Sequence, residues 1–538
     1  MGLHLTGIKS MKRKHKIYLC MTLFLLAIYI GLLAILCISE HSDNTATIRS
    51  FKDAFWYSLV TLTTVGYGDL TPVTPLGKAV GVIFLLMSAG IMMTLFGAAV
   101  SFVTSEGLPF FLLSLQREKN WYYFADCGVE SITLAANIYR EEPDTVIIFG
   151  EKTDDHTEFP DFPCLFINAS PAKIIAHKKN MGSICKIFLM KENDIGTNSR
   201  AIDLHELPVE VYARTTNGQD HLSGNINFFH SYDCCARQYW HSKPLCNAEN
   251  TIVIIGFGNY GRCILKRAIL TNILSVDQHV SYHIFGDAES FLATHNHLHE
   301  TFSLNKTSDT TDSLIFHKEL WELNHMVMAQ ADRIIICPDN EPEGWNIYWR
   351  LNSYYQIRGN IHLHSNRKTP GITYFGTNEE IYTPNQIMRT SLNRAAVIIN
   401  EIFCKSVSYP TKTWEELDAF HRESKIAAAD HILMKIRVLM QDEDITELTP
   451  KVTQEAYQKY CKNKQSATIL DTYRKLDHTR WRRFYTYYNW TYGPTRNDID
   501  RQHPMLCPYE QLNAEQKRER DAAWELLGSI AAELNETI

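Results

Sequence analysis

Two long apolar runs lie near the N-terminus, and neither contains a charged residue. Residues 17–38 form a run of 22 residues, and residues 79–103 form a second run of 25. As helices they would be about 33 Å and about 37 Å long, so each can span a bilayer. Residues 51–63 predict a shorter helix between them, which must re-enter the membrane and is tolerated only inside a protein-walled cavity.

Basic residues cluster ahead of the first run, between positions 9 and 16. By the positive-inside rule they place the N-terminus in the cytoplasm, and two crossings return the long C-terminal part to the same side. A secretory signal is the alternative, but the run is longer than a signal core and lacks an evident cleavage site. We predict a multi-pass protein of the plasma (inner) membrane with both termini cytoplasmic.

Beyond residue 119 the pattern becomes that of a soluble α/β protein. Short β-rich runs alternate with helical stretches, which is typical of a doubly wound parallel sheet. This order occurs twice, so we expect two Rossmann-like copies. Strands are predicted at residues 121–125, 145–149, 164–168, 186–191, 209–214 and 226–229 in the first copy, and at 251–255, 281–285, 313–316, 331–337, 360–364 and 371–376 in the second.

A capped helix follows the second copy. Thr383 is expected as its N-cap, with Pro384 in the first turn and Gln386 closing a capping box. The apolar stripe of this helix must be buried, either in the core of its own domain or against a partner domain. The stripe consists of Leu392, Ala395, Ala396, Ile399 and Phe403.

Composition argues against several functions. The net charge is −7 and no basic stretch is interleaved with aromatic residues, so nucleic-acid binding has no support. The 13 cysteines include no C-x-x-C pair, which argues against a disulfide framework or a structural zinc site. His295, His297 and His299 would share one face of a strand, but no carboxylate spacing supports a metal site there.

The segment after the re-entrant helix contains the clearest chemistry. The carbonyls from Thr64 to Tyr67, together with the Thr64 hydroxyl, can replace the hydration shell of a potassium ion. Gly66 and Gly68 give the backbone the freedom to point those carbonyls at one axis. An ordinary glycine-rich turn is the alternative. The predicted selectivity filter is Thr63-Thr64-Val65-Gly66-Tyr67-Gly68-Asp69.

One filter strand cannot surround an ion, so four copies must meet on an axis and we predict a homotetramer. Trp56 and Tyr57 on the re-entrant helix are expected to brace the filter. Asp69 at the outer mouth is expected to accept a hydrogen bond from one of them. Alternatively, the two aromatic residues are ordinary residues of the membrane interface.

A second motif opens the second Rossmann-like copy, between the strand at 251–255 and a helical stretch at 262–268. In a dinucleotide fingerprint the first glycine permits the tight turn, the second lets backbone approach a pyrophosphate, and the third lets helix and strand pack closely. A purely structural glycine turn is the alternative. The predicted residues for binding NAD(H) or another adenine nucleotide are Gly256, Gly258, Asn259, Tyr260, Gly261 and Asp287.

Two departures from that fingerprint affect the prediction. Gly286 occupies the position expected for the acid that binds the ribose, so Asp287 is offset by one residue. In the first copy the corresponding turn, residues 126–131, keeps only the middle glycine, Gly128. There Asp126 would place a carboxylate where a phosphate should lie, and we predict that the first copy binds no dinucleotide.

Residues 17–104 resemble the two-helix prokaryotic potassium channels, and the match includes every position of the filter. The resemblance implies a gating hinge at Gly90, although close helix packing by Gly81, Gly90 and Gly97 explains the same glycines equally well. Val60 stands where some of these channels have a glutamate behind the filter. The resemblance therefore does not extend to slow inactivation through a carboxyl pair.

Residues 119–405 resemble tandem RCK domains of the TrkA-N type, and the capped helix resembles their dimerisation segment. The resemblance implies that eight such domains form a cytoplasmic gating ring, which pulls on the inner helices through the linker 105–118. Residues 466–530 resemble the RyR domain in the order and spacing of their motif residues. Within it, His478, Trp481, Trp490 and Tyr492 either line a ligand cleft or belong to the core.

These observations predict a membrane α-helical two-helix pore module, cytoplasmic α/β Rossmann-like RCK domains and a small, mainly α C-terminal domain. The expected boundaries are 1–16, 17–104, 105–118, 119–243, 249–405, 406–464 (a helical connector) and 465–530. We predict that the protein is not an enzyme. We predict instead a tetrameric potassium channel in membrane lipid, gated by a small regulatory ligand. A potassium uptake transporter subunit and a membrane-tethered nucleotide-binding oxidoreductase are the alternatives.

Overall fold

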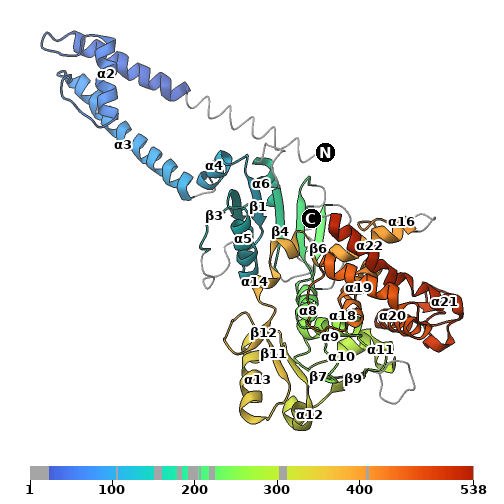
Figure 1. Cartoon of the computed structure of the whole chain (residues 1–538). Helices are drawn as coiled ribbons and strands as arrows, with labels where there is room; N and C mark the ends of the chain where they lie inside the picture. The colour runs from blue at the N-terminus through green and yellow to red at the C-terminus, as the bar shows by residue number, and fades with distance from the viewer. Residues whose placement is uncertain are drawn as a thin grey trace. The chain divides into compact units, whose positions relative to one another are not determined.

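The computed structural model describes residues 23–104, 107–150, 160–177, 185–191, 204, 207–216, 225–301, 312–389, 391–406 and 411–536 (Figure 1). The chain divides into two compact units, Met1–Leu113 and Ser114–Ile538. The basic residues at positions 9–16 lie outside the described residues.

The first unit is built from helices. Two of them, Leu23–His41 and Pro75–Val103, are long and apolar enough to cross a membrane, as predicted. The second belongs to α3 (Pro75–Thr104), and the shorter α2 (Phe51–Leu62) precedes it in the chain. A capping box of Ser50 and Asp53 fixes where α2 begins. Most of the expected linker forms a further helix, α4 (Gly107–Leu115).

The first Rossmann-like copy is a parallel sheet with the strand order β3-β2-β1-β4-β5-β6. The order reverses between β1 and β4, which is where doubly wound sheets bind ligands. The strands are β1 (Asn120–Phe124), β2 (Thr145–Phe149), β3 (Cys164–Phe166), β4 (Cys185–Leu189), β5 (Glu210–Arg214) and β6 (Ile226–Phe229), and the helices are α5 (Val129–Glu141), α6 (Pro171–His177) and α8 (Ser231–Ser242).

The second copy repeats this topology with the order β12-β11-β10-β7-β8-β9, and its strand order reverses between β7 and β10. Every predicted strand of both sheets is present, with ends shifted by at most two residues, so the doubly wound fold is confirmed. The strands are β7 (Thr251–Ile255), β8 (Ser281–Phe285), β9 (Ser313–His317), β10 (Arg333–Ile336), β11 (Asn360–His364) and β12 (Thr373–Phe375), and the helices are α9 (Asn259–Thr271), α10 (Glu289–Thr294), α11 (Asn296–Thr301), η1 (Trp321–Leu323), α12 (His325–Gln330) and α13 (Glu341–Tyr354).

After the short helix α14 (Asn378–Ile381), the predicted capped helix is divided into α15 (Pro384–Ile387), η2 (Ser391–Asn393) and α16 (Arg394–Ser406). Thr383 caps α15 by accepting a hydrogen bond from Gln386 N, as predicted. The second half of the capping box is wrong, because Gln386 Oε1 is buried without a partner in the described chain. Within the apolar stripe, Ala396 and Ile399 of α16 are buried against helices of the C-terminal region, whereas Phe403 is 38% exposed.

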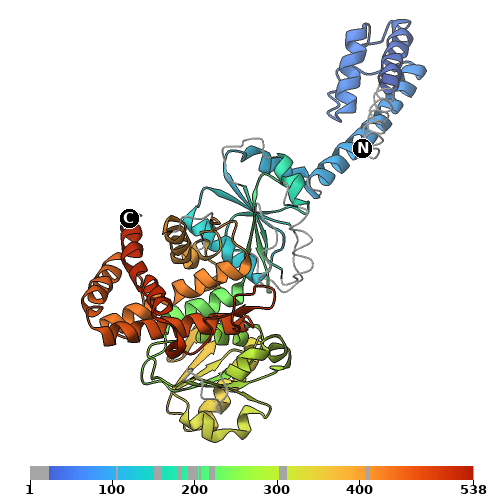
Figure 2. The same cartoon turned by 90° about the vertical axis from the view of Figure 1, so that its right-hand side faces the viewer.

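That C-terminal region is mainly helical. Its long helix α20 packs against α9 and α11 of the second copy (Figure 2). A buried ion pair between Arg483 on α20 and Asp312 at the start of β9, 2.8 Å apart, fastens the two parts together. The elements are α17 (Ala419–Asp430), α18 (Ile432–Met440), α19 (Pro450–Asn463), α20 (Ala467–Tyr487), β13 (Thr491–Tyr492), β14 (Gln502–His503), η3 (Tyr509–Gln511), α21 (Ala514–Glu519) and α22 (Ala522–Glu536).

Candidate functional site

Along the backbone of the predicted filter, residues with positive φ alternate with residues whose φ is negative. Thr64, Gly66 and Gly68 have positive φ angles of 61°, 59° and 75°, whereas Val65 and Tyr67 between them do not. In an ordinary strand successive carbonyls point to opposite sides. A left-handed residue at every second position rotates the peptide planes so that the carbonyls share one side. This is the geometry that a row of ion-binding carbonyls requires.

Thr64 is the member of this series that the sequence did not reveal. A β-branched residue in the left-handed region is an outlier that costs about 1–3 kcal/mol and persists only where its surroundings impose it. Main-chain hydrogen bonds to the end of α2 hold it there. Thr61 O accepts from Thr64 N at 3.1 Å, and Val60 O accepts from Val65 N at 3.0 Å and from Gly66 N at 3.2 Å.

Side chains of α2 brace the outer end of the filter. Trp56 Nε1 donates to Asp69 Oδ2 at 2.9 Å, which confirms the expected hydrogen bond. The Trp56 ring also stacks on Tyr67, with centroids 6.2 Å apart and planes 4° from parallel. Tyr57 points elsewhere and packs against Phe84 of α3. Trp56 therefore braces the filter, and Tyr57 joins α2 to α3.

The glycines of α3 differ in their surroundings. A Cβ at Gly81 would lie 2.7 Å from the Tyr57 hydroxyl, so close packing accounts for this glycine. A Cβ at Gly90 or Gly97 would meet no atom of the described chain within 4 Å. Gly90 lies within the uninterrupted helix α3, and its role as a hinge stays a prediction.

A buried carboxylate that sequence reasoning missed secures the segment between the filter and α3. Glu40, at the end of the first helix, is fully buried. Its Oε2 accepts from Val73 N at 2.9 Å, and its Oε1 accepts from the N and Oγ1 of Thr74 at 3.0 and 2.5 Å. A Cβ at Gly77 would lie 2.0 Å from Glu40 Oε1, so glycine there leaves room for the carboxylate.

In the second copy, the glycine turn after β7 is closely packed. Gly256 has φ of +95°, and a Cβ there would lie 2.4 Å from the backbone nitrogen of Pro338. A Cβ at Gly261 would lie 2.1 Å from Gly256 O. The first and third glycines of the motif are therefore required by the packing of the chain itself.

The middle glycine faces a carboxylate. Gly258 is the N-cap of α9 and has no side chain to bond the free N–H groups of the first turn. Asp339, just after β10, supplies the acceptor: its Oδ2 lies 3.1 Å from Asn259 N and its Oδ1 3.4 Å from Tyr260 N. A Cβ at Gly258 would lie 2.4 Å from Asp339 Oδ2. Asp339 thus occupies the place expected for a phosphate.

The other residues around this turn are arranged as follows. Asp287 is exposed, and its Oδ1 accepts from the N of Glu289, the first residue of α10, at 3.0 Å. Gly286 has φ of +144° and a Cβ there would lie 2.6 Å from Phe257 N, so an acid does not fit its position. The ring of Tyr260 lies against His364, with centroids 3.8 Å apart. Burial lowers the pKa of His364 to about 4, so its imidazole is neutral at pH 7.

The corresponding turn of the first copy is closed by its own side chains. Asp126 is 6% exposed, and its Oδ1 accepts from Gly128 N at 3.0 Å and from Ser131 Oγ at 2.8 Å. Ser131 stands where Gly261 stands in the second copy. The expected carboxylate is therefore present at this turn.

In the C-terminal region the four predicted cleft residues differ in exposure. His478 is 1% exposed and its Nε2 lies 3.0 Å from Cys507 O, and burial lowers its pKa to about 4. Trp481 packs on Tyr485, and Trp490 is buried, whereas Tyr492 is 60% exposed. This arrangement favours the core interpretation over a shared cleft.

The alternating histidines do not lie on a strand. His295 is the C-cap of α10, and His297 and His299 belong to α11. Within the described part of the chain, no group of three or more His, Cys, Asp or Glu side chains could hold a metal ion.

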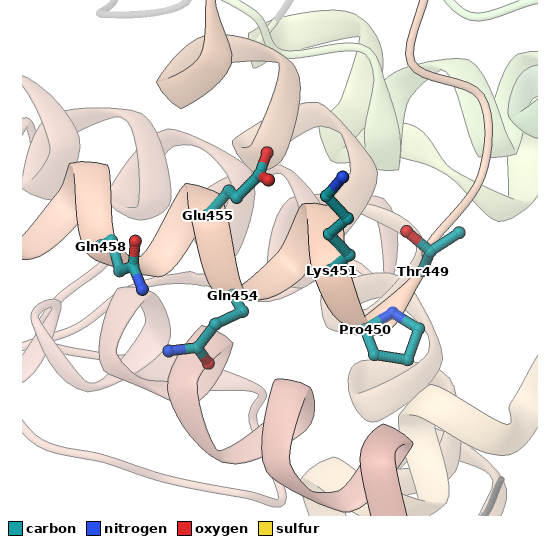
Figure 3. A pocket seen from close by; sticks show the side chains of 6 residues that line it. All are labelled: Thr449, Pro450, Lys451, Gln454, Glu455 and Gln458. Carbon is teal, nitrogen blue, oxygen red and sulfur yellow. The ribbon is translucent and has the colours of Figure 1, made fainter.

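Two hollows lie away from the predicted sites. One is an open surface along α19, where Lys451, Gln454, Glu455 and Gln458 spread from a single helix (Figure 3). The other is a cavity of about 370 Å³ in the first copy, near the carboxyl ends of β1 and β4. Its lining includes Tyr123, Ala125, Gly150, Asn168, Ser170 and Leu189.

Family models match one segment near each end of the chain. Residues 17–105 match the ion channel family model, and residues 461–533 match the RyR domain model. A voltage-gated potassium channel of Aeropyrum pernix is 36% identical over 93 residues, which are 17% of this chain and 31% of that one. The calcium-gated potassium channel TvoK of Thermoplasma volcanium is 23% identical over 122 residues, 23% of this chain and 35% of its own.

Solved structures of the GsuK channel cover more of the chain. One is 13% identical with a TM-score of 0.40, covering 69% of this chain and 98% of its own. Another, bound to NAD, is 11% identical with a TM-score of 0.38, covering 70% and 84%. Likeness at this level is too low to support an argument. The sequence matches to the Aeropyrum pernix and Thermoplasma volcanium channels cover about a third of each channel, so they describe one domain of this chain and not the whole protein. The chain thus contains a pore domain of the ion-channel family, homologous to potassium channels, and a RyR domain.

Proposed function

We propose that this chain is one subunit of a homotetrameric, potassium-selective channel whose opening is regulated by a cytoplasmic nucleotide. The observation that carries the proposal is the filter itself. Its alternating left-handed residues turn a row of carbonyls to one side, and it lies between a short helix and a second spanning helix. A single strand provides oxygens on one side of an ion, so four strands around an axis complete the coordination shell.

The surface of α3 supports assembly within a membrane. Leu86, Met93 and Phe96 are 69%, 76% and 73% exposed in the single chain. Side chains of this kind are stable against lipid tails or against the same helix of neighbouring subunits. We place the pore domain in the plasma (inner) membrane, with both termini cytoplasmic and Gly90 as the gating hinge.

The regulatory part of the proposal concerns the glycine turn of the second copy. The turn follows a buried central strand and opens α9, and its first two main-chain N–H groups are bonded by an anionic group. A nucleotide phosphate, from NAD(H) or another adenine nucleotide, satisfies the same groups. The nucleotide regulates the pore only by binding open and closed states unequally, with a typical coupling of about 1–3 kcal/mol.

Ion flux from liposomes tests the pore. We expect purified protein to pass potassium far faster than sodium, and Gly66→Ala to abolish the potassium flux, because a Cβ strains the left-handed backbone there. Gly31→Ala is the matched control, since a Cβ there meets no atom within 4 Å. Equal passage of sodium and potassium by the unaltered protein would contradict the proposal.

The nucleotide response is tested in the same liposomes with Gly258→Asp. The new carboxylate would compete with Asp339 for the start of α9 and repel phosphate. We expect the flux to lose its response to NAD and ADP while potassium selectivity is unchanged. Asn352→Asp, which adds the same charge on the exposed side of α13, should retain the response. A full response in Gly258→Asp would refute the site.

A further inference from the structure

The carboxylate of Asp339 reaches across the point where the strand order of the second sheet reverses. It starts from the loop between β10 and α13 and ends at the first turn of α9, whose helix follows the neighbouring strand β7. Its two oxygens lie 3.1 Å and 3.4 Å from the N–H groups of Asn259 and Tyr260. Both donors belong to residues that the sequence predicted to bind the nucleotide.

We propose that Asp339 is a built-in competitor of the nucleotide: its carboxylate holds the phosphate position closed until a phosphate group displaces it. This inference rests on the proposed nucleotide regulation and adds how the site is controlled. The carboxylate lies close against the turn, since a Cβ at Gly258 would meet Asp339 Oδ2 at 2.4 Å, and a phosphate bonded to the same two N–H groups would overlap it. Two anions in this place repel each other and share the same donors.

Asp339 is free to leave the site. The residue is exposed, and the hydrogen bonds of its carboxylate go to main-chain N–H groups. The loop on either side of it is anchored independently. Pro338 is packed against Gly256, and Glu341 accepts from Ser365 Oγ at 2.6 Å and from Asn366 N at 3.0 Å. Rotation of the Asp339 side chain into solvent therefore opens the site without dismantling the loop.

This arrangement determines which ligands bind. A ligand that displaces the carboxylate must return two hydrogen bonds to the start of α9 and match the preference of a helix N-terminus for negative charge. ADP and NAD have phosphates that do so, and adenosine has none. Release of a contact equivalent to a helix cap changes an equilibrium by roughly five- to thirtyfold.

The test uses the full chain in detergent and the variant Asp339→Ala. Binding of ADP, NAD and adenosine is measured by titration calorimetry, and thermal unfolding is measured without ligand. We expect Asp339→Ala to lower the unfolding temperature and yet to bind ADP roughly five- to thirtyfold more tightly. Adenosine affinity should not change. If the Asp339 carboxylate merely braced the loop, Asp339→Ala would lower both the unfolding temperature and the ADP affinity, and the inference would be wrong.

Asp332→Ala is the matched control. Asp332 Oδ2 also accepts from two main-chain N–H groups, Asn250 N at 2.8 Å and Thr251 N at 2.9 Å, but at the opposite end of β7. We expect it to lower stability and to leave ADP affinity unchanged. If the unaltered chain binds ADP and Asp339→Ala binds it no more tightly, the inference is wrong while nucleotide regulation stands. If neither the unaltered chain nor Asp339→Ala binds ADP or NAD, the inference and the proposed nucleotide regulation both fail. The proposed potassium channel is then still tested by ion flux.

Discussion

The two Rossmann-like copies place a carboxylate beside the same helix terminus in different ways. In the first copy Asp126 lies within the turn and bonds Gly128 N and Ser131 Oγ, two and five residues away. In the second copy the equivalent positions are Gly256 and Gly261, and the acceptor comes from Asp339, 80 residues beyond Asn259. Both turns thus place a carboxylate near the start of a helix, where free N–H groups favour negative charge.

The difference lies in what each carboxylate can do. Asp126 is buried and tied to its own turn, so it closes that turn permanently. Asp339 is exposed and belongs to a separate loop, so it is exchangeable for another anion. A local acceptor braces its own turn, and an acceptor from a distant segment makes a site that can be opened.

The largest expected loss of unfolding free energy comes from a substitution at one equivalent position on the first helix of each copy. Arg267 on α9 is fully buried and bonds Asp233 of α8 and Glu423 of α17. Its counterpart Asn137 on α5 makes a neutral hydrogen bond to Tyr382 O at 2.8 Å. We expect Arg267→Leu to cost about 3–5 kcal/mol of unfolding free energy, because it removes a buried guanidinium from Asp233 and Glu423 and leaves Lys266 as their shared cation.

Asn137→Ala should cost only about 1–2 kcal/mol, since it leaves the Tyr382 carbonyl unpaired, and the guanidinium of exposed Arg140, which also donates to Asn137, can bond water instead. Denaturant unfolding of the detergent-solubilised chain measures both variants. Equal losses for the two would contradict the idea that this position of α9, unlike its counterpart on α5, is held through buried charge.

The next effect concerns the first position of each turn. Gly256→Ala places a Cβ 2.4 Å from Pro338 N at a φ of +95°, and we expect it to cost about 2–4 kcal/mol. The same unfolding experiment measures it. A loss below about 1 kcal/mol would mean that the glycine is not required by the approach of Pro338.

Asp126→Ala, at the equivalent position of the first copy, is expected to cost about 1–2 kcal/mol, because it leaves Gly128 N and the buried Ser131 hydroxyl without their acceptor. In contrast to Asp339→Ala, it should create no affinity for ADP, because the turn has no exchangeable acceptor. Calorimetric titration with ADP checks this. Tight ADP binding by Asp126→Ala would show that the two copies differ less than their turns suggest.

The smallest expected effect is a pH dependence of the unfolding free energy. It depends on the last residue of β11, His364, whose counterpart at the end of the equivalent strand β5 is Arg214. Burial lowers the pKa of His364 to about 4 from an ordinary 6.5. On acidification the unfolded chain takes up the proton first, so this contribution to stability is complete above pH 6.5 and declines toward pH 4. Between pH 7 and 5.5 the loss is about 1 kcal/mol.

His364→Asn should remove that part of the pH dependence, whereas Arg214→Lys should leave the dependence intact, because a lysine also stays charged over this range. Unfolding free energies measured at pH 7 and 5.5 give the comparison. Parallel pH curves for the unaltered chain and His364→Asn would contradict the expectation.

Local patterns made much of the structure predictable. Apolar runs gave both spanning helices, and β-rich runs gave all the strands of both sheets. Trp56 and Asp69, 13 residues apart, meet as expected. The features that sequence reasoning missed depend on distant partners. Glu40 bonds Val73 over 33 residues, and Asp339 bonds Asn259 over 80.

Thr64 was missed for another reason. Sequence rules assign positive φ to glycine, and the hydrogen bonds from the end of α2 override that preference at a threonine. The signals that could have been used are indirect. Gly77 leaves space for Glu40, and Gly258 leaves space for Asp339, so each glycine marks the approach of a group from elsewhere in the chain.

The clamp formed by Glu40 has a mechanical consequence for α3. Because Glu40 binds Val73 and Thr74, the start of α3 is tied to the end of the first helix. In the proposed channel, a pull on the far end of α3 would tilt that helix about this tie without straining the predicted filter. Ion selection and opening would then be mechanically separate.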